Sequence, residues 1–193
     1  MKYKVYVLTC DKYLSAIPPF MWLFRKYWSK EQEVVIAGYT QPTFPLPENF
    51  RFLSIGRQED YPIEKWSDGL IRLLRNIEDT HIVLMLEDYW ISRDVNVEAV
   101  QMLCDYADQF RYVLKIDLCG DRLYAGGADL EYGVCGYLDL VKSDPASQYH
   151  CSLLSGIWNR ELLLRVPKTI TSFAAERTRG VPSNSTCHGD SLG

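Results

Sequence analysis

Two adjacent carboxylates, Glu87 and Asp88, follow a run of five apolar residues at positions 82–86. Such a run, with two β-branched residues, predicts a strand that is buried on both faces. In open α/β sheets ligands bind outside the carboxyl ends of the strands, so we expect both acids at the rim of a crevice. The alternative is that Glu87 and Asp88 only end the strand and cap the next element.

A second group of polar residues follows the first predicted strand, residues 4–9. Thr9, Asp11 and Tyr13 offer a hydroxyl, a carboxylate and a ring face, which together suit a base or a ribose. If the sheet is parallel here, these residues face the same crevice as Glu87. The alternative is an Asx-type turn that leads into a helix.

Further candidates lie in the C-terminal half of the chain. Gly156 permits close approach of a ligand to the backbone, and Trp158 offers a ring on which a sugar could stack. The alternative at this position is a strand-to-helix turn with a buried tryptophan. Glu176 is the sole carboxylate of residues 171–180.

The elements that would position these residues alternate between strands and helices. Apolar and β-branched runs predict strands at 4–9, 33–39, 50–56, 82–90 and 111–118. Apolar residues at three- and four-residue steps predict helices at 20–28, 66–77 and 96–110, the second capped by Ser67 or Asp68 and the third by residues 92–94. This order predicts an α/β fold with a single Rossmann-like domain, in which helices flank a mixed, mostly parallel sheet.

The C-terminal part is less regular. Residues 120–136 are glycine-rich and predict a long loop or an irregular hairpin, followed by short strands at 137–141 and 149–154 and a helix at 161–166. From residue 181 the chain is polar, which predicts a flexible or truncated tail. We therefore expect one domain over residues 1–180 and a tail over residues 181–193.

Composition narrows the classes of function. The chain has 193 residues, 47% of them hydrophobic, and a net charge of -4 at pH 7, so no nucleic-acid partner is expected. The six cysteines form no C-x-x-C pair and the three histidines do not repeat at ligand spacings, so no zinc site is expected. Without a signal peptide or an apolar run long enough for a membrane span, a cytoplasmic location is expected.

The order of these pieces resembles the GT-A type of glycosyltransferase, which transfers a sugar from a nucleotide donor. The resemblance covers about residues 1–180. Four segments carry the resemblance. The first strand with its polar end is residues 7–13, and the capped helix is residues 66–77. The Leu-Glu-Asp-Tyr-Trp strand end is residues 86–90, and the Trp-containing segment before Glu176 is residues 155–160.

The resemblance implies a divalent cation, manganese or magnesium. In that family an Asp-x-Asp motif holds the cation on the donor pyrophosphate, where it neutralises the leaving nucleoside diphosphate. This chain has adjacent acids instead of spaced ones, and neighbouring strand residues point to opposite faces. Asp88 is therefore the expected metal ligand and Glu87 a secondary, donor-side residue.

The resemblance also assigns roles to the other candidates. Glu176 is the expected general base on the acceptor hydroxyl, the alternative being an exposed helix-cap glutamate. Gly156 and Trp158 are expected on the acceptor side. The expected contacts of the donor nucleotide are Thr9, Asp11, Tyr13, Asp68 and Glu87.

The function implied is transfer of a sugar from a nucleotide-sugar donor to a glycan or glycoconjugate acceptor, in synthesis of a surface polysaccharide. The alternative is a non-catalytic module of the same fold that binds a nucleotide or a carbohydrate. A module needs no general base, so the two hypotheses differ in what they require of Glu176.

Overall fold

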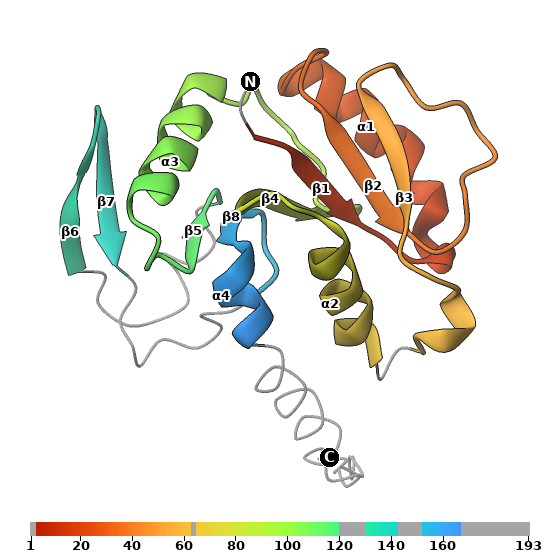
Figure 1. Ribbon diagram of the computed structural model, residues 1–193. Helices are drawn as coiled ribbons and strands as arrows, with labels where there is room; N and C mark the ends of the chain where they lie inside the picture. Colours follow the sequence, from red (N-terminus) through yellow and green to blue (C-terminus); the bar gives the residue numbers. More distant parts are fainter. Residues whose placement is uncertain (1–2, 63–64, 120–129, 143–151, 167–193) are drawn as a thin grey trace, which may run out of the picture.

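The computed structural model describes residues 3–62, 65–119, 130–142 and 152–166. A six-stranded sheet with the order β3-β2-β1-β4-β8-β5 forms its centre (Figure 1). The strands are β1 (Val5–Leu8), β2 (Val34–Gly38), β3 (Phe50–Ser54), β4 (His81–Leu86), β5 (Lys115–Asp117) and β8 (Gly156–Asn159). Strands β1 to β4 are mutually parallel, whereas β8 is antiparallel to both β4 and β5. The predicted fold class, a Rossmann-like α/β fold with a mixed, mostly parallel sheet, is confirmed.

Among the described residues, four α-helices cover the two faces of this sheet (Figure 1). Helices α1 (Ile17–Tyr27) and α3 (Val97–Gln109) pack with Val5, Val7 and Met85 on one face. Helices α2 (Trp66–Asn76) and α4 (Arg160–Arg165) contribute to the core of the other face, together with Tyr6 and Leu84. Alternate residues of β1 and β4 thus enter different cores, which explains why their sequences are apolar without alternation.

The helices follow their sequence patterns, but two predicted caps are wrong. In α2 the predicted apolar face is buried, and Arg72 and Arg75 lie outside it, exposed. The residue before α2 is Lys65, and no side chain caps the helix, so Ser67 and Asp68 lie inside its first turn. Helix α3 is capped by Asn96, whose Oδ1 accepts a hydrogen bond of 3.0 Å from the backbone N–H of Ala99.

The C-terminal half differs most from the predictions. Residues 156–159 form the strand β8 rather than a turn, and the described part of the predicted strand 149–154 contains no strand. The predicted strand 137–141 is confirmed as β7 (Leu138–Lys142), which pairs antiparallel with β6 (Leu130–Cys135) at the end of the segment predicted as a long loop or an irregular hairpin. Figure 1 shows this hairpin on the far side of α3 from β1.

The polar turn residues at positions 11–16 and 58–60 form two short 3-10 helices, η1 (Asp11–Ala16) and η2 (Gln58–Asp60). Both follow parallel strands, at the edge of the sheet where Glu87 also lies. Within the described part of the chain, no helix has the length and apolar character needed to cross a bilayer.

Candidate functional site

The order of the parallel strands reverses between β1 and β4. From β1 the chain runs through α1 to β2 and then to β3 on one side, and it returns through α2, on the opposite face, to β4 on the other side. In doubly wound sheets such a reversal opens a crevice outside the carboxyl ends of the two strands. The segments that leave these ends are residues 9–13 and 87–90, which are the two polar groups that the sequence singled out.

Glu87 is the buried acid of this edge. It is 6% exposed and follows directly after β4. Burial raises the pKa of Glu87 to about 7, against the effect of a backbone hydrogen bond, and the neighbouring Asp88 carboxylate raises it further. A carboxyl group with such a pKa can take up and release a proton near neutral pH.

Asp88 has the opposite environment. The chain turns at this point, with the Tyr89 N–H donating to the Leu86 carbonyl at 3.3 Å and the Trp90 N–H to the Asp88 carbonyl at 3.1 Å. Asp88 is exposed, whereas Glu87 is buried. The two adjacent acids therefore present one solvent-facing carboxylate and one inner carboxyl group to whatever binds beside them.

Asp11 connects the loops that follow three strands. Its carboxylate accepts hydrogen bonds from the Thr40 N–H at 3.0 Å and the Thr40 hydroxyl at 2.7 Å. The backbone N–H of Asp11 donates to Gln58 Oε1 at 3.1 Å, and Gln58 Nε2 donates to the Tyr61 carbonyl at 3.0 Å. Asp11 therefore joins the loops that follow β1, β2 and β3, a role that a local Asx turn alone would not give it.

The other donor-side candidates have different surroundings. Thr9 is 4% exposed, and its hydroxyl donates to the Cys10 carbonyl at 3.4 Å, so Thr9 is part of the packed floor. Tyr13 is 46% exposed, with Lys12 Nζ at 5.0 Å from its ring centroid. Asp68 is exposed in the first turn of α2.

Two stacked tyrosines that are not among the predicted site residues lie at this edge. The rings of Tyr39 and Tyr61 lie 5.5 Å apart at an interplanar angle of 29°. Tyr39 follows β2 directly, and a Cβ added at Gly69 of α2 would overlap its hydroxyl. The sequence did contain a signal, because Tyr39 ends the predicted strand 33–39, with Thr40 directly after it, just as Thr9 ends the first predicted strand.

Trp158 does not lie where the stacking hypothesis needs it. It pairs with Ile82 in the centre of the sheet, is 0% exposed, and has the Lys115 ammonium 4.9 Å from its ring. A ring without exposed surface cannot stack on a sugar, so the alternative of a buried tryptophan describes this residue. Gly156 is likewise buried in β8, where an added Cβ would lie 3.0 Å from the Ile116 carbonyl oxygen.

Lys115 and Asp117 share one face of β5, as their alternation predicts, and form an ion pair. The Lys115 ammonium also donates to the Ser152 carbonyl at 2.8 Å. Its side chain is 5% exposed, so this charge belongs to the interior between β5 and β8.

The structure bears differently on the expected metal ligand, Asp88, and on the expected general base, Glu176. Within the described residues no group of three or more His, Cys, Asp and Glu side chains could hold a metal ion. A cation at this edge would therefore depend on Asp88 and on oxygens of a ligand. Glu176, the expected general base, lies outside the described residues.

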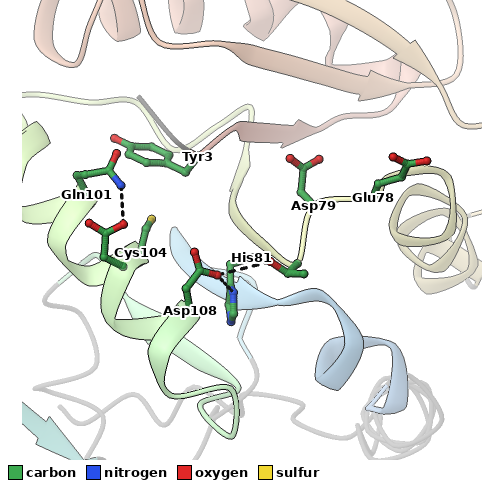
Figure 2. A pocket seen from close by; sticks show the side chains of 9 residues that line it. Tyr3, Glu78, Asp79, His81, Gln101, Cys104 and Asp108 are labelled. Atoms are coloured by element: carbon green, nitrogen blue, oxygen red, sulfur yellow. Dashed lines mark hydrogen bonds and ion pairs between the residues drawn. The ribbon is translucent and has the colours of Figure 1, made fainter.

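A cavity of about 290 Å³ opens at the opposite, amino edge of the sheet (Figure 2). We call it the acidic cavity, because Glu78, Asp79, Asp105 and Asp108 contribute to its lining. In Figure 2, His81 and Asp108 face each other, and His81 Nδ1 lies 2.6 Å from Asp108 Oδ1. This cavity is separated from Glu87 by the whole length of β4.

No known family model matches the sequence, and no curated protein matches it. The structure is similar to the apo-form glycosyltransferase GlyE of Streptococcus pneumoniae TIGR4, at 10% identity and a TM-score of 0.41. It is also similar to 2-C-methyl-D-erythritol 4-phosphate cytidylyltransferase from Thermus thermophilus, at 11% identity and a TM-score of 0.40.

These similarities cover 96% and 95% of this chain, respectively. They cover 40% of the GlyE chain and 80% of the cytidylyltransferase chain, so this chain spans less than half of the pneumococcal protein. At such TM-scores the similarity carries no conclusion about the site. The assignment of a function depends on the carboxyl edge itself.

Proposed function

We propose that this chain is a nucleotide-sugar-dependent glycosyltransferase whose donor binds at the carboxyl edge between β1 and β4. The observation that carries the proposal is the pair of acids at the reversal of strand order, Glu87 buried and Asp88 exposed. The acceptor would be a glycan or glycoconjugate, in synthesis of a surface polysaccharide. Glu176 remains the proposed general base.

The loops beside the acids suit a nucleoside. Asp11 is fixed by Thr40, and its carboxylate oxygens retain lone pairs toward solvent that a ribose hydroxyl can use. Tyr13 has nearly half of its surface exposed and offers a ring face to a base. Thr9 supports these groups from below, and Asp68 lies at the start of α2 on the same edge.

A divalent cation fits this edge with Asp88 as its protein ligand. Mg²⁺ is usually held by one or two carboxylates together with substrate phosphates and water, so a donor diphosphate would supply the remaining oxygens. The cation would neutralise charge on the leaving nucleoside diphosphate. Asp88 would hold it, and Glu87 would join only when ionised.

Glu87 would then respond to the ligand. Without a cation its raised pKa keeps a large fraction of the side chain neutral near pH 7, which limits the negative charge that faces a diphosphate. A protonated carboxyl group can also donate a hydrogen bond to a phosphate oxygen. A nearby cation favours the ionised form instead, so binding of the donor and release of a proton are coupled.

Calorimetric titration of UDP and GDP into the purified protein, with and without Mn²⁺, tests the proposal. We expect binding of one nucleotide that Mn²⁺ strengthens, and at least tenfold weaker binding in Asp88→Asn. Asp139→Asn, which changes an exposed aspartate of the β6–β7 hairpin, is the matched control and should bind like the unchanged protein. A folded protein that binds neither nucleotide would overturn the proposal.

A measurement of turnover distinguishes the transferase from the alternative, a non-catalytic module of the same fold. After nucleotide binding is established, hydrolysis or transfer of the matching nucleotide sugar is measured in the unchanged protein and in Glu176→Gln. Loss of turnover with unchanged nucleotide affinity supports the transferase. Binding with no turnover in any acceptor mixture supports the module.

A further inference from the structure

A second cavity, of about 230 Å³, lies at the amino edge of the sheet beside the acidic cavity. We call it the arginine cavity, because Arg111, Arg160 and Arg165 line it, together with His81, Asn159 and one acid, Glu161. Thr80 and His81 belong to the lining of both cavities. The arginine cavity thus carries a concentration of positive charge in a chain whose net charge is -4.

The wall of the arginine cavity is built by hydrogen bonds between distant parts of the chain. Asn159 pairs with His81 in the sheet, its Nδ2 donates to the Arg111 carbonyl at 3.0 Å, and its Oδ1 accepts from the Leu162 N–H at 3.0 Å. The backbone N–H of Arg160 donates to the Thr80 carbonyl at 2.9 Å. Asn159 therefore fixes the three segments that carry the arginines and the histidine.

Two buried nitrogen atoms of this lining have no hydrogen-bond partner among the described residues, His81 Nε2 and Arg160 Nε. The guanidinium of Arg160 stays protonated, so its Nε–H is always a donor. Its Nη1 is engaged with the Leu74 carbonyl at 3.2 Å, which holds the side chain in place. A buried donor without an acceptor destabilises the protein, so a ligand that supplies an acceptor here would be favoured.

His81 can offer a second hydrogen-bond donor to such a ligand. Its side chain is 5% exposed, and Nδ1 contacts the Asp108 carboxylate on the side of the acidic cavity. Figure 2 shows this contact, with Glu78 and Asp79 further along the same cavity. When the ring carries protons on both nitrogens, Nδ1 donates to Asp108 and Nε2 is a second donor for a ligand.

The remaining charges favour an anion on the arginine side only. Arg111 is exposed, and no partner of its guanidinium is found among the described residues. Arg165 pairs with Glu161, which also lines the arginine cavity, so the guanidinium groups of Arg111 and Arg160 are the ones without an acidic partner among the described residues. The carboxylates Glu78, Asp79, Asp105 and Asp108 lie in the acidic cavity and repel an anion from that side.

We propose that the arginine cavity binds the phosphoryl group of a small molecule. Planar guanidinium groups match the oxygens of phosphate, and a tetrahedral phosphate offers acceptors in more directions than a carboxylate does. The volume exceeds that of a single ion, so a small phosphate ester fits as well as inorganic phosphate does. The site is independent of the proposed nucleotide site, which lies at the other edge of the sheet.

The test is calorimetric titration of inorganic phosphate and, separately, of glycerol 3-phosphate into the full chain at pH 7. We expect saturable binding, at least tenfold weaker in Arg160→Gln and in Arg111→Gln. Arg72→Gln, on the exposed face of α2, is the matched control and should bind phosphate like the unchanged protein. Tighter binding of glycerol 3-phosphate supports an ester as the ligand, and equal or weaker binding supports the inorganic ion.

Arg160 also supports α2, so its variant is checked for folding by circular dichroism. If Arg160→Gln does not fold, phosphate binding to Arg111→Gln, which changes an exposed residue, is the test. No saturable binding to the unchanged protein overturns the proposal. Equal binding in Arg111→Gln and the unchanged protein, or an equal loss in Arg72→Gln, also overturns it, because the phosphate would then bind elsewhere.

Discussion

Glu87 and Asp88 are neighbours in sequence with different access to water. The strand β4 ends where the core meets the surface, so the first acid after it is enclosed and the second is exposed. Burial of a carboxyl group penalises its charged form, whereas exposure does not. One strand end therefore provides both a group that exchanges protons near neutral pH and a group that offers a carboxylate to a cation.

The raised pKa of Glu87 predicts a pH-dependent stability. Its pKa is raised to about 7 from 4.5, so the folded state binds more protons than the unfolded state between these values. The associated stability is complete below pH 4.5 and is lost as the pH rises through 7. Over that window Glu87 removes at most about 3 kcal/mol from the free energy of unfolding.

Urea unfolding of the unchanged protein and of Glu87→Gln at pH 5 and pH 8 measures this effect. We expect the variant to gain stability relative to the unchanged protein at pH 8, because it removes the cost of ionising a buried group. Glu98→Gln changes an exposed acid in the first turn of α3 and should change the stability by the same amount at both pH values. The same difference between Glu87→Gln and the unchanged protein at both pH values would contradict the prediction.

Among the elements, α2 is tied to the carboxyl edge by a glycine. The Tyr39 hydroxyl occupies the space that a side chain at Gly69 would fill, and the Tyr39 ring stacks on Tyr61. The beginning of α2 can therefore approach the loop after β2 closely. That contact sets the distance between the helix start and the loop of Thr40, which in turn fixes Asp11.

Gly69→Ala should destabilise the protein by about 1–3 kcal/mol through overpacking. In a Tyr39→Phe background the hydroxyl is absent, and alanine should be neutral or stabilise by up to about 1 kcal/mol through its helix propensity. Thermal or urea unfolding of the two single variants and the double variant gives the coupling. Additive effects would show that Tyr39 does not occupy this space.

A comparison of the predicted and observed elements shows which sequence patterns were sufficient to predict a helix or a strand. Continuous apolar runs and helical periodicity located β1, β2, β4, α1 and α2, because these segments bury one or two complete faces. The strand β8 was missed because its four residues, Gly-Ile-Trp-Asn, are too few to show a period and derive their structure from pairing with β4. Local signals likewise suggested caps at Ser67 and at residues 92–94, where none forms.

The candidate site was predictable only in part for the same reason. Glu87, Asp88, Thr9 and Asp11 could be identified from the predicted ends of the strands, because an apolar run followed by a polar residue is a local pattern. The partners of Asp11 come from other loops, Thr40 after β2 and Gln58 after β3, and no local pattern joins them. The burial of Trp158 was not predictable either, because it depends on the insertion of β8 into the sheet.

For the whole molecule, stability should be unequally distributed. The strands β1 and β4 pair on both sides and are buried, whereas β6 and β7 pair only with each other among the described strands. Their hairpin leaves Tyr132, Val134 and Tyr137 exposed and is joined to α3 by contacts such as the 2.9 Å hydrogen bond from Asn96 Nδ2 to the Tyr137 hydroxyl.

Native-state hydrogen exchange measures this distribution. Amides of β1 and β4 should exchange only through global unfolding, and hydrogen-bonded amides of β6 and β7 through local opening with a lower free energy. Asn96→Ala should raise exchange in the hairpin more than in β1. Equal protection of the hairpin and β1 would show that the two sheets unfold as one unit.

The position of β8 also has a consequence for how the chain is made. It lies between β4 and β5, yet it follows both in the sequence. During synthesis the apolar edge of β4 emerges from the ribosome early and stays unpaired on that side until residues 156–159 have emerged. A nascent chain of this topology exposes a strand that can pair with other chains, so its yield in cells should depend on chaperones that bind emerging polypeptides.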